Sequence, residues 1–325
     1  MLSVLLHEHY GLTGDLELLD SHFGTKIYLV RTDRGKLIVK TLPLSHGARM
    51  ENEGRITQRL AAQGIPVARL LKTKQGVYHA ETGDISVHVQ EFVEGMIPAV
   101  NTAPDGMLVK MADLLGKMHL ALADNEPMEI SFGEGFFRKS RARRAKRHYG
   151  KKLRASKKQG DTVLISQLEE RVKHLRRISK FRINARRLTY CNSHGDFHIG
   201  QVIANGGDIT VIDWTSACRL PACLEVIMSY VTAAPACAQG EIGADGLIKY
   251  ISQYAKHRAL SAYDLEMMPY VFYFQQILCH YPPPYGNVAE TYKPICELIN
   301  RFARWLYDHA EELSMELSKE ASRYA

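Results

Sequence analysis

The 325-residue sequence has no long apolar run, no internal repeat and no paired cysteine motif. A membrane-spanning helix needs about 20 predominantly apolar residues, and no stretch of this chain approaches that length. Residues 1–12 contain neither a basic leader nor a small-residue cleavage site, which favours a cytoplasmic protein. The six cysteines show no C-x-x-C spacing, so we expect reduced core thiols instead of a disulfide framework or a zinc site.

The composition is typical of a globular protein with a large core. Hydrophobic residues make up 46% of the chain and charged residues 24%, and the mass is 36.7 kDa. A chain of this length exceeds the usual size of one domain, which favours two domains or two lobes.

Positive charge is concentrated in residues 136–160. This stretch holds twelve Lys and Arg and no acid, and because the whole chain carries +7, the remainder carries +7 − 12 = −5. Three interpretations stay open: a solvated, partly mobile helix, which we favour, a patch for an anionic partner, and a nucleic-acid contact. Too few aromatic residues are present for a base-stacking platform, which argues against nucleic acid. A polycationic ligand would be repelled.

Residues 190–214 carry the strongest chemical pattern. Two short β-branched runs are joined by Asn205-Gly206-Gly207-Asp208, which predicts a tight antiparallel hairpin. The returning strand then brings Asp213 beside Gln201, just after the loop that carries Asp196. Two carboxylates and an amide in one small volume suit a hard divalent cation such as magnesium.

This stretch resembles the catalytic loop and the metal-binding strand of the aminoglycoside phosphotransferase and choline kinase family, which are relatives of the protein kinases. The family pattern H-G-D-x-x-x-x-N matches residues 194–201 with Gln201 in place of Asn, and the pattern I-D-W matches residues 212–214. The resemblance implies that Asp196 is the catalytic base and that Gln201 and Asp213 bind magnesium. Gln201 keeps the amide oxygen of Asn but adds one methylene group.

Alternating apolar and polar residues near the N-terminus predict three antiparallel strands between Leu16 and Thr41. The first connection contains Ser21, Gly24 and Thr25, small residues whose backbone N–H groups can approach a phosphate closely. A plain hairpin loop is the alternative interpretation of this connection.

Lys40 lies among aliphatic residues in the third of these strands, where an unpaired charge is costly. By the resemblance, it holds the α- and β-phosphates of ATP and pairs with a Glu of the next helix, residues 47–63. Glu53 shares the apolar face of that helix, whereas Glu51 lies on its polar face. We therefore expect Glu53 to pair with Lys40.

Two further strands are predicted near residues 76–79 and 85–92. The second runs into a segment that resembles the hinge between the two lobes of the family. By that resemblance, the Glu91 carbonyl and the Val93 N–H bind the edge of the adenine ring. These are backbone roles, so the side chains at the two positions say little about them.

Helical periodicity begins near residue 107 and recurs along the rest of the chain, which ends in a helix predicted over residues 288–320. His119 shares the apolar stripe of its helix, so we expect a core histidine and not a ligand. Glu225 is the acid nearest to the position where the family often carries a P-x-x-D-L-A pattern. The Pro- and Tyr-rich loop of residues 280–286 is either a connector, which we favour, or a wall of the acceptor site.

Together these patterns predict an α+β protein with a two-lobed protein-kinase-like fold. Residues 1–93 form a nucleotide-binding small lobe with an antiparallel sheet, and residues 94–325 form a mainly helical lobe that binds the substrate and carries the catalytic loop. The resemblance implies transfer of the γ-phosphoryl group of ATP, with Mg²⁺, to a hydroxyl of a small molecule such as an antibiotic, an amino alcohol or a sugar. Two alternatives stay open: a nucleotide-binding protein without catalysis, similar to spore-coat members of this fold, and a basic nucleic-acid-binding protein.

Overall fold

The computed structural model describes residues 2–22, 24–33, 35–124, 126–160, 162–280 and 293–320. The chain forms two compact units. The first comprises Met1–Pro98, His194–Asp196 and Gly200–Ala217, and the second comprises Ala99–Ser193, Phe197–Ile199 and Cys218–Ala325. The lobe boundary between residues 93 and 94 stays a prediction, because these units are defined by contacts and each gathers separate segments of the chain.

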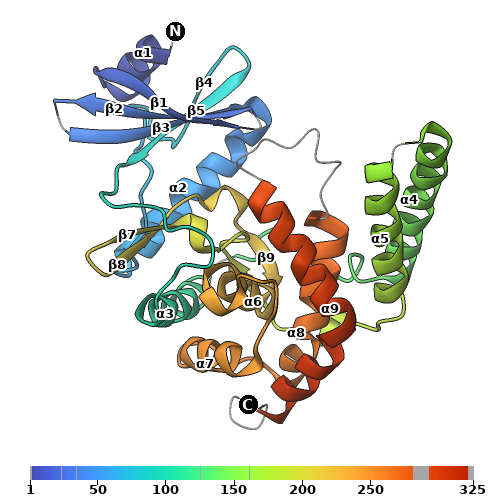
Figure 1. The fold of residues 1–325 in the computed structure, drawn as a ribbon. Coiled ribbons are helices and arrows are strands. Elements are labelled where there is room, and N and C mark those ends of the chain that lie inside the picture. Colours follow the sequence, from blue (N-terminus) through green and yellow to red (C-terminus); the bar gives the residue numbers. More distant parts are fainter. Residues whose placement is uncertain are drawn as a thin grey trace. The chain divides into compact units, whose positions relative to one another are not determined.

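A five-stranded antiparallel sheet dominates the first unit (Figure 1). Its strands, in the order β1-β2-β3-β5-β4, are β1 (Asp15–His22), β2 (Thr25–Thr32), β3 (Gly35–Pro43), β4 (Ala80–Thr82) and β5 (Ile85–Glu91). The three strands predicted between Leu16 and Thr41 are confirmed. The strand predicted near residues 76–79 is wrong, because Gly76 adopts a φ of +85° in a turn and β4 begins only at Ala80.

A helical segment at the start of the chain packs against this sheet, which the sequence did not lead us to expect. The segment consists of α1 (Leu2–Leu5) and a π-helical turn, η1 (Leu6–Tyr10). Both share one buried hydrophobic cluster with Val39 of β3 and Val89 of β5. The Tyr10 hydroxyl donates to the Val87 carbonyl at 3.2 Å. The first residues are therefore part of the core of the first unit.

The helix α2 (Gly47–Ala62) follows β3 and confirms the helix predicted over residues 47–63. Met50 and Leu60 on its apolar face are buried. Glu53 lies on the same side and is 1% exposed, whereas Glu51 is half-buried and bonded to a backbone N–H. The helical period therefore identified correctly which acid faces inward.

The predicted antiparallel hairpin is confirmed as β7 (Val202–Asn205) and β8 (Asp208–Val211), and it belongs to the first unit. Its two turn glycines, residues 206 and 207, have φ values of +55° and +93°, which glycine adopts without strain. β7 also pairs with the segment after β5, because the backbone groups of Met96 and Ala204 exchange hydrogen bonds of 3.0 and 2.9 Å.

The second unit is mainly helical, as predicted. Its α-helices are α3 (Asp105–Ala121), α4 (Lys139–Gln159), α5 (Thr162–Ile178), α6 (Ala222–Ala233), α7 (Ala244–Ala255), α8 (Ala262–Gln275) and α9 (Lys293–Lys319). A two-stranded ribbon of β6 (Tyr190–Ser193) and β9 (Cys218–Pro221) accompanies them and was not predicted. His119 of α3 is fully buried, which confirms the expected core histidine.

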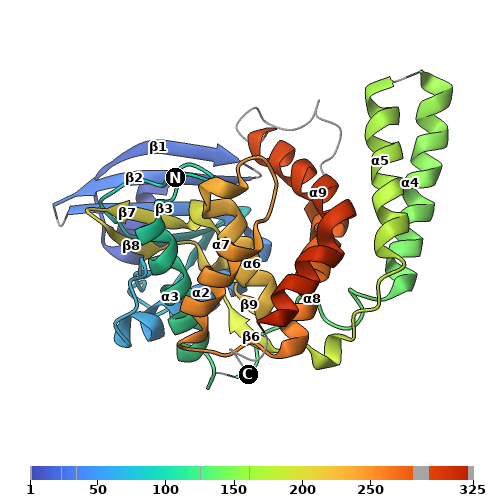
Figure 2. The ribbon, with the colours of Figure 1, turned by 60° about the horizontal axis from the view of Figure 1, so that its bottom comes forward.

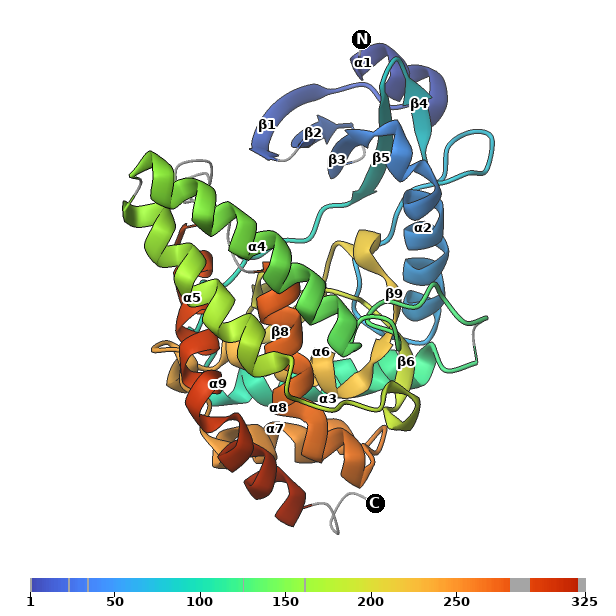
Figure 3. The ribbon, with the colours of Figure 1, turned by 90° about the vertical axis from the view of Figure 1, so that its right-hand side faces the viewer.

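The basic stretch forms α4, which lies side by side with α5 (Figures 2 and 3). Ala142 and Ser156 are buried on the inner face of α4, and Lys157 forms an ion pair of 2.6 Å with Glu169 of α5. Most Lys and Arg side chains of α4 are exposed, as expected for the solvated helix that the sequence favoured.

In the part of the chain that the structure describes, no helix combines the length and the apolar composition needed to cross a membrane.

Two predicted features fall outside the described residues. They are the loop predicted over residues 280–286, except for residue 280, and the start of the closing helix at residues 288–292.

Candidate active site

Lys40 is a buried cation near the centre of the sheet. β3 lies between β2 and β5, and Lys40 is paired across these strands with Ile27 and His88. The residue is 5% exposed, and its Nζ lies 3.5 Å from Oδ2 of Asp213. A buried ammonium needs an opposite charge close by, and Asp213 supplies it.

Asp213 follows β8 and holds an unusual backbone conformation. Its φ of +62° lies in the left-handed region, which Asp tolerates better than most residues. The Thr215 hydroxyl donates to Oδ1 at 2.6 Å. Burial would raise the pKa of Asp213, but Lys40, the Thr215 hydroxyl and His194 hold it well below its usual range. The side chain is still 34% exposed, so the carboxylate is both charged and accessible.

Glu53 connects α2 to the residue after Asp213. Its Oε1 accepts the backbone N–H of Trp214 at 3.0 Å, and its Oε2 lies 3.7 Å from Nδ1 of His88. Burial raises the pKa of Glu53 to about 7, although Lys40 acts to lower it. Burial and the Lys40 charge lower the pKa of His88 to about 3, so His88 is neutral and the Glu53–His88 contact is not an ion pair.

The ion pair of Lys40 therefore differs from the expected one. The sequence predicted a direct pair with Glu53, whereas the close carboxylate in the structure belongs to Asp213. Glu53 acts on Lys40 through its charge and fixes the backbone beside Asp213. The buried residues Lys40, Glu53 and His88, together with the partly exposed Asp213, are called the lysine cluster below.

His194 joins the segment that carries Asp196 to the segment that carries Asp213. The imidazole Nε2 donates to the Ile212 carbonyl at 2.9 Å, and Nδ1 then accepts the backbone N–H of Asp196 at 3.4 Å. The ring is fully buried and lies 4.6 Å from the Trp214 ring, centroid to centroid. Because His194 bonds to both backbones, the half-buried Asp196 is held at a fixed position relative to Asp213.

Gln201 lies at the start of the hairpin, beside the strand end that leads to Asp213. Its carbonyl accepts the backbone N–H of Ile212 at 3.0 Å, so Gln201 and Asp213 are close along the two paired strands, as predicted. A carboxylate and an amide oxygen are two ligands of the kind that Mg²⁺ uses, since it fills its other positions with water and phosphate. Groups of three or more His, Cys, Asp or Glu suited to a metal do not occur among the described residues, and a magnesium site of this type does not require one.

The small residues proposed for phosphate contacts lie at the β1–β2 turn. β1 ends at His22 and β2 begins at Thr25, so this connection is tighter than the sequence suggested. Gly24 has a φ of +81°. The Ser21 N–H already donates to Oδ1 of Asp20 at 2.7 Å, and it would have to exchange this partner to bind a phosphate.

The residues proposed for the adenine edge lie where β5 leaves the sheet. β5 ends at Glu91, whose N–H donates to the Arg69 carbonyl at 2.9 Å and whose side chain pairs with the Arg69 guanidinium. Val93 is half-buried two residues later. Glu91 ends a strand that neighbours the strand of Lys40, and Val93 follows that strand.

Comparison with known protein families identifies the family to which this chain belongs. A family model described as the phosphotransferase enzyme family matches residues 15–260, which is most of the chain. The chain belongs to the phosphotransferase enzyme family. Lys40, Asp196 and Asp213 all lie within the matched residues. Comparison with curated protein sequences finds no match.

Solved structures identify the fold of this phosphotransferase as protein-kinase-like, as predicted. An amicoumacin kinase in complex with AMP-PNP, Ca²⁺ and its ligand gives a TM-score of 0.61 at 14% identity, over 90% of this chain and 88% of that chain. A spectinomycin phosphotransferase with ADP and spectinomycin gives 0.61 at 12% identity, over 98% of each chain. Choline kinase from Cryptosporidium parvum Iowa II gives 0.58 at 10% identity, over 93% of this chain and 91% of that chain.

A second buried group in the phosphotransferase fixes the residues on either side of the His194–Asp196 segment. Glu225 of α6 is fully buried, accepts the Phe197 N–H at 3.2 Å and accepts the Ser193 hydroxyl. His119 Nε2 lies 2.9 Å from the same carboxylate. Burial would lower the pKa of His119, but neighbouring groups and the hydrogen bond to Glu225 raise it well above its usual value, so His119 is a cation. His119, Ser193 and Glu225 are called the glutamate cluster below.

Sequence reasoning missed two of these residues as parts of the site. His88 lies in β5, whose residues 86–90 are all buried, so alternation along the strand could not single it out. Glu225 was noted only as the nearest acid to a family pattern. Its distance of four residues from Pro221 was the available signal, and its role depends on contacts with residues about 30 positions earlier in the chain.

Proposed function

We propose that this phosphotransferase moves the γ-phosphoryl group of ATP to a hydroxyl group of a small molecule. The observation that carries the proposal is the pairing of Lys40 with Asp213, together with the His194 bridge that holds Asp196 next to this pair. Phosphoryl transfer requires mainly positioning and neutralisation of charge. A buried cation and two carboxylates on one rigid support are suited to both tasks.

Asp196 is the proposed base for the acceptor hydroxyl. The hydroxyl oxygen forms a bond to the γ-phosphorus, its proton passes to the Asp196 carboxylate, and the bond from the γ-phosphorus to the bridging oxygen breaks, releasing ADP. Lys40 binds the α- and β-phosphates, and its charge offsets the negative charge that develops on the leaving group. Glu53 keeps its proposed role of supporting Lys40, through its charge and through the Trp214 N–H.

Magnesium is the proposed metal, with Asp213 and Gln201 as its protein ligands. Bound by these two residues, the ion would neutralise phosphate charge. Asp213 fits this role because its pKa is held low and its carboxylate is partly accessible. Gln201 contributes only an amide dipole, so Asp213 is the stronger ligand.

The remaining nucleotide contacts are proposed to come from the backbone. The N–H groups of the β1–β2 turn, at Ser21, Gly24 and Thr25, bind phosphate oxygens. The Glu91 carbonyl and the Val93 N–H bind the adenine edge. Complexes of the amicoumacin kinase and the spectinomycin phosphotransferase with AMP-PNP and ADP support a nucleotide in this fold.

The acceptor is proposed to be an antibiotic, an amino alcohol or a sugar that carries a hydroxyl. The names of the similar structures, which include an aminopropanol kinase, support this range and no single member of it. We place the protein in the cytoplasm, a proposal supported by the buried thiols of Cys191, Cys223 and Cys237.

A screen of hydroxyl-bearing compounds by ATP consumption tests the proposal. Wild type, Asp196→Asn and the control Asp245→Asn are assayed together, the control removing an exposed carboxylate from α7. A phosphorylated product from wild type and control, and none from Asp196→Asn, is the expected result. Stabilisation by ATP without any product would instead indicate a nucleotide-binding protein without catalysis. If the wild type neither forms a product nor is stabilised by ATP, the proposal that the protein binds ATP is wrong.

A further inference from the structure

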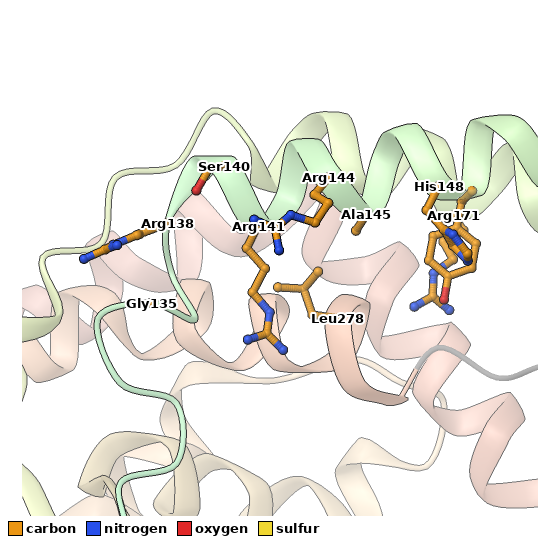
Figure 4. A pocket seen from close by; sticks show the side chains of 10 residues that line it. Gly135, Arg138, Ser140, Arg141, Arg144, Ala145, His148, Arg171 and Leu278 are labelled. Carbon is orange, nitrogen blue, oxygen red and sulfur yellow. The ribbon is translucent and has the colours of Figure 1, made fainter.

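The second unit contains a cavity of about 550 Å³ beside the first half of α4. Its walls come from α4 and the residues before it, from Arg171 of α5 and from Leu278 of the π-helical turn η7 (Gln276–His280) (Figure 4). Small-molecule sites have volumes of about 300–1,000 Å³. The cavity is therefore large enough for an organic molecule.

The α4 wall is a single face of the helix. Arg138, Arg141, Arg144 and His148 line the cavity at intervals of three and four residues, and residues at this spacing share one face. Figure 4 shows the side chains of Arg141 and Arg144 on the side of α4 near Leu278, with Arg171 and His148 next to one another further along the helix. Residues from two helices, α4 and α5, thus bring positive charge to one space.

No acid is among the described residues that line the cavity, whereas four of them are Arg and one is His. Guanidinium groups do not lose their proton in proteins. The Glu134 carboxylate lies 3.9 Å from Arg138 and is outside the cavity lining. Like charges on one helix face repel one another, and a bound anion offsets that repulsion.

Two of the guanidinium groups lie over aromatic rings. Arg141 lies over the Phe136 ring at 4.6 Å, and Arg171 lies over the Tyr149 ring at 4.0 Å. Arg171 is 5% exposed and donates to the Ile277 carbonyl at 3.0 Å. The Phe136 ring fixes the plane of the Arg141 guanidinium and leaves its charge in place. Arg planes fixed in this way are suited to two parallel hydrogen bonds with a phosphate.

The start of α4 adds a further preference for anions. Arg138 is the N-cap residue of this 21-residue helix, and no acid lies in its first turn. The N-terminal end of a helix carries a partial positive charge and unpaired N–H groups. Ser140 and Arg141, in that first turn, line the cavity.

We propose that this cavity binds a small organic molecule that carries a phosphate group. Arg141 and Arg144 bind the phosphate, and Tyr149 and Leu278 contact the organic part. The proposal does not depend on the phosphotransfer reaction described above. The molecule is either the acceptor itself or a ligand that does not react, and both sources share the same chemistry.

Calorimetric titration of the full chain without nucleotide tests this site. The probes are phenyl phosphate and glycerol 3-phosphate, with phenol and glycerol as uncharged counterparts. The test variant combines Arg141→Gln with Arg144→Gln. The control combines Arg143→Gln with Arg147→Gln, which removes the same charge from exposed positions of α4 outside the cavity lining.

At least one phosphate probe should bind to wild type, and its uncharged counterpart should not. The test variant should lose about tenfold or more in affinity, because the charge-assisted hydrogen bonds of the two arginines to phosphate together contribute at least that factor. The control should stay within about twofold of wild type. Equal weakening in both variants would overturn the proposal, because it would show attraction to the whole basic helix. The proposal would also be overturned if neither phosphate probe binds at millimolar concentration.

Two added measurements separate the remaining interpretations. The first is the affinity for a single-stranded oligonucleotide. If the oligonucleotide binds more tightly than the phosphate probes, and if both variants lower its affinity equally, the basic helix is a contact for a polymer and not the proposed site. Incubation of the bound probe with ATP and Mg²⁺ then distinguishes the two sources. A gain of one phosphoryl group in the glycerol 3-phosphate mass identifies an acceptor, and an unchanged mass identifies a non-reacting ligand. Because binding is measured without ATP, a failure of the transfer reaction leaves the result for this site intact.

Discussion

The lysine cluster and the glutamate cluster are both largely buried groups of polar and charged side chains, but they differ in how fully they are hydrogen-bonded. In the glutamate cluster, one carboxylate receives the Phe197 N–H, the Ser193 hydroxyl and the His119 ring. In the lysine cluster, Oε2 of Glu53 and both ring nitrogens of His88 have no hydrogen-bond partner, as judged over the described residues. Asp213 there remains partly accessible.

This difference agrees with the roles proposed for the two clusters, the lysine cluster as a ligand site and the glutamate cluster as its support. Buried polar atoms without partners cost free energy, and such costs are retained where a ligand or a reaction uses them. A closed network fixes a conformation and has no capacity left for a ligand. The lysine cluster should therefore respond to nucleotide and metal, and the glutamate cluster should respond to neither.

The largest expected effect is on turnover, from Asp196→Asn. Asn keeps the shape of Asp196 but cannot take the proton of the acceptor, and positioned bases typically contribute about 10²- to 10⁴-fold. ATP affinity should be unchanged, because the proposed nucleotide contacts come from Lys40, the backbone and the metal ligands. The measurement is kcat beside the Kd for ATP in wild type and variant. Unchanged turnover would remove Asp196 from the role of base.

The second effect separates the two proposed metal ligands. Asp213→Asn should weaken Mg²⁺-dependent ATP binding at least about tenfold more than Gln201→Ala does, because a contact to a charged group is stronger than one to a neutral group. Titration of Mg²⁺ against ATP binding in both variants measures the difference. Equal losses would show that the metal site has been assigned to the wrong residues.

The third prediction concerns a substitution that disrupts the glutamate cluster. Glu225→Gln leaves the His119 cation without its buried carboxylate and should lower the free energy of unfolding by about 3 kcal/mol. The control Asp113→Asn alters the half-exposed contacts of Asp113 with Lys117 and His257 and should cost less than about 1 kcal/mol. Both values come from denaturant unfolding.

A positioning role for Glu225 predicts one further change. In the fraction of Glu225→Gln that is folded, kcat should fall while the Kd for ATP stays constant, because the residue fixes the backbone at Ser193 and Phe197 and not the nucleotide site. A folded variant with full kcat would show that Glu225 acts on stability alone.

The fourth prediction is a small change in kcat/KM. Gln201→Asn restores the family residue and should leave kcat/KM within about tenfold of wild type, a change of roughly 1.4 kcal/mol in the transition state. A loss as large as that of Asp213→Asn would instead mean that the extra methylene of Gln201 belongs to a re-spaced metal site.

The fifth effect appears only as the pH falls. The pKa of His88 is lowered from 6.5 to about 3, so between these values the unfolded chain takes up a proton that the folded chain does not. The wild type should therefore lose up to about 1.4 kcal/mol per pH unit through His88 as pH falls from 6.5 towards 3. Glu53 acts in the opposite direction between about 7 and 4.5, because its pKa is raised on folding.

His88→Gln removes the first of these contributions. The groups facing His88 are Lys40, Glu53, Asp213 and His79, and all remain in the variant. Its free energy of unfolding should rise relative to wild type by up to about 1.4 kcal/mol per unit of pH decrease. Urea unfolding at several pH values measures the difference. The control is His79→Gln, at a more exposed histidine, and the same trend in this control would show that burial of His88 is not the cause.

The sequence was sufficient where the signal was local. The turn residues 205–208 predicted the hairpin that returns Asp213 to the neighbourhood of Gln201, although the observed register places Ile212 and not Asp213 opposite Gln201. Helical periodicity selected Glu53 over Glu51 as the inward-facing acid. The two-lobed kinase-like fold followed from the resemblance of the Asp196 and Asp213 motifs.

The rest depended on contacts between distant residues. The Lys40–Asp213 pair joins positions 173 residues apart, and no pattern near Lys40 distinguishes Asp213 from Glu53 as the closer carboxylate. The role of residues 2–10 in the core was missed because so short an apolar segment is compatible with a helix, a strand or a loop. The position of β4 was missed because Gly76 and the residues after it were assigned to a strand, whereas the backbone stays irregular from the turn near Gly76 until Ala80.

The left-handed backbone of Asp213 has a consequence for the evolution of the protein. Asn, Asp and Gly are the residues that adopt this conformation most readily, and among them only Asp carries a charge. In the genetic code, the Asn codons and the Gly codons GGU and GGC convert to an Asp codon by a single nucleotide change. A lineage that lost the carboxylate in either way would keep the shape of the turn and could regain the charge in the same kind of step. Loss through a β-branched residue would strain the turn as well, so compensating changes elsewhere would then stand in the way of recovery.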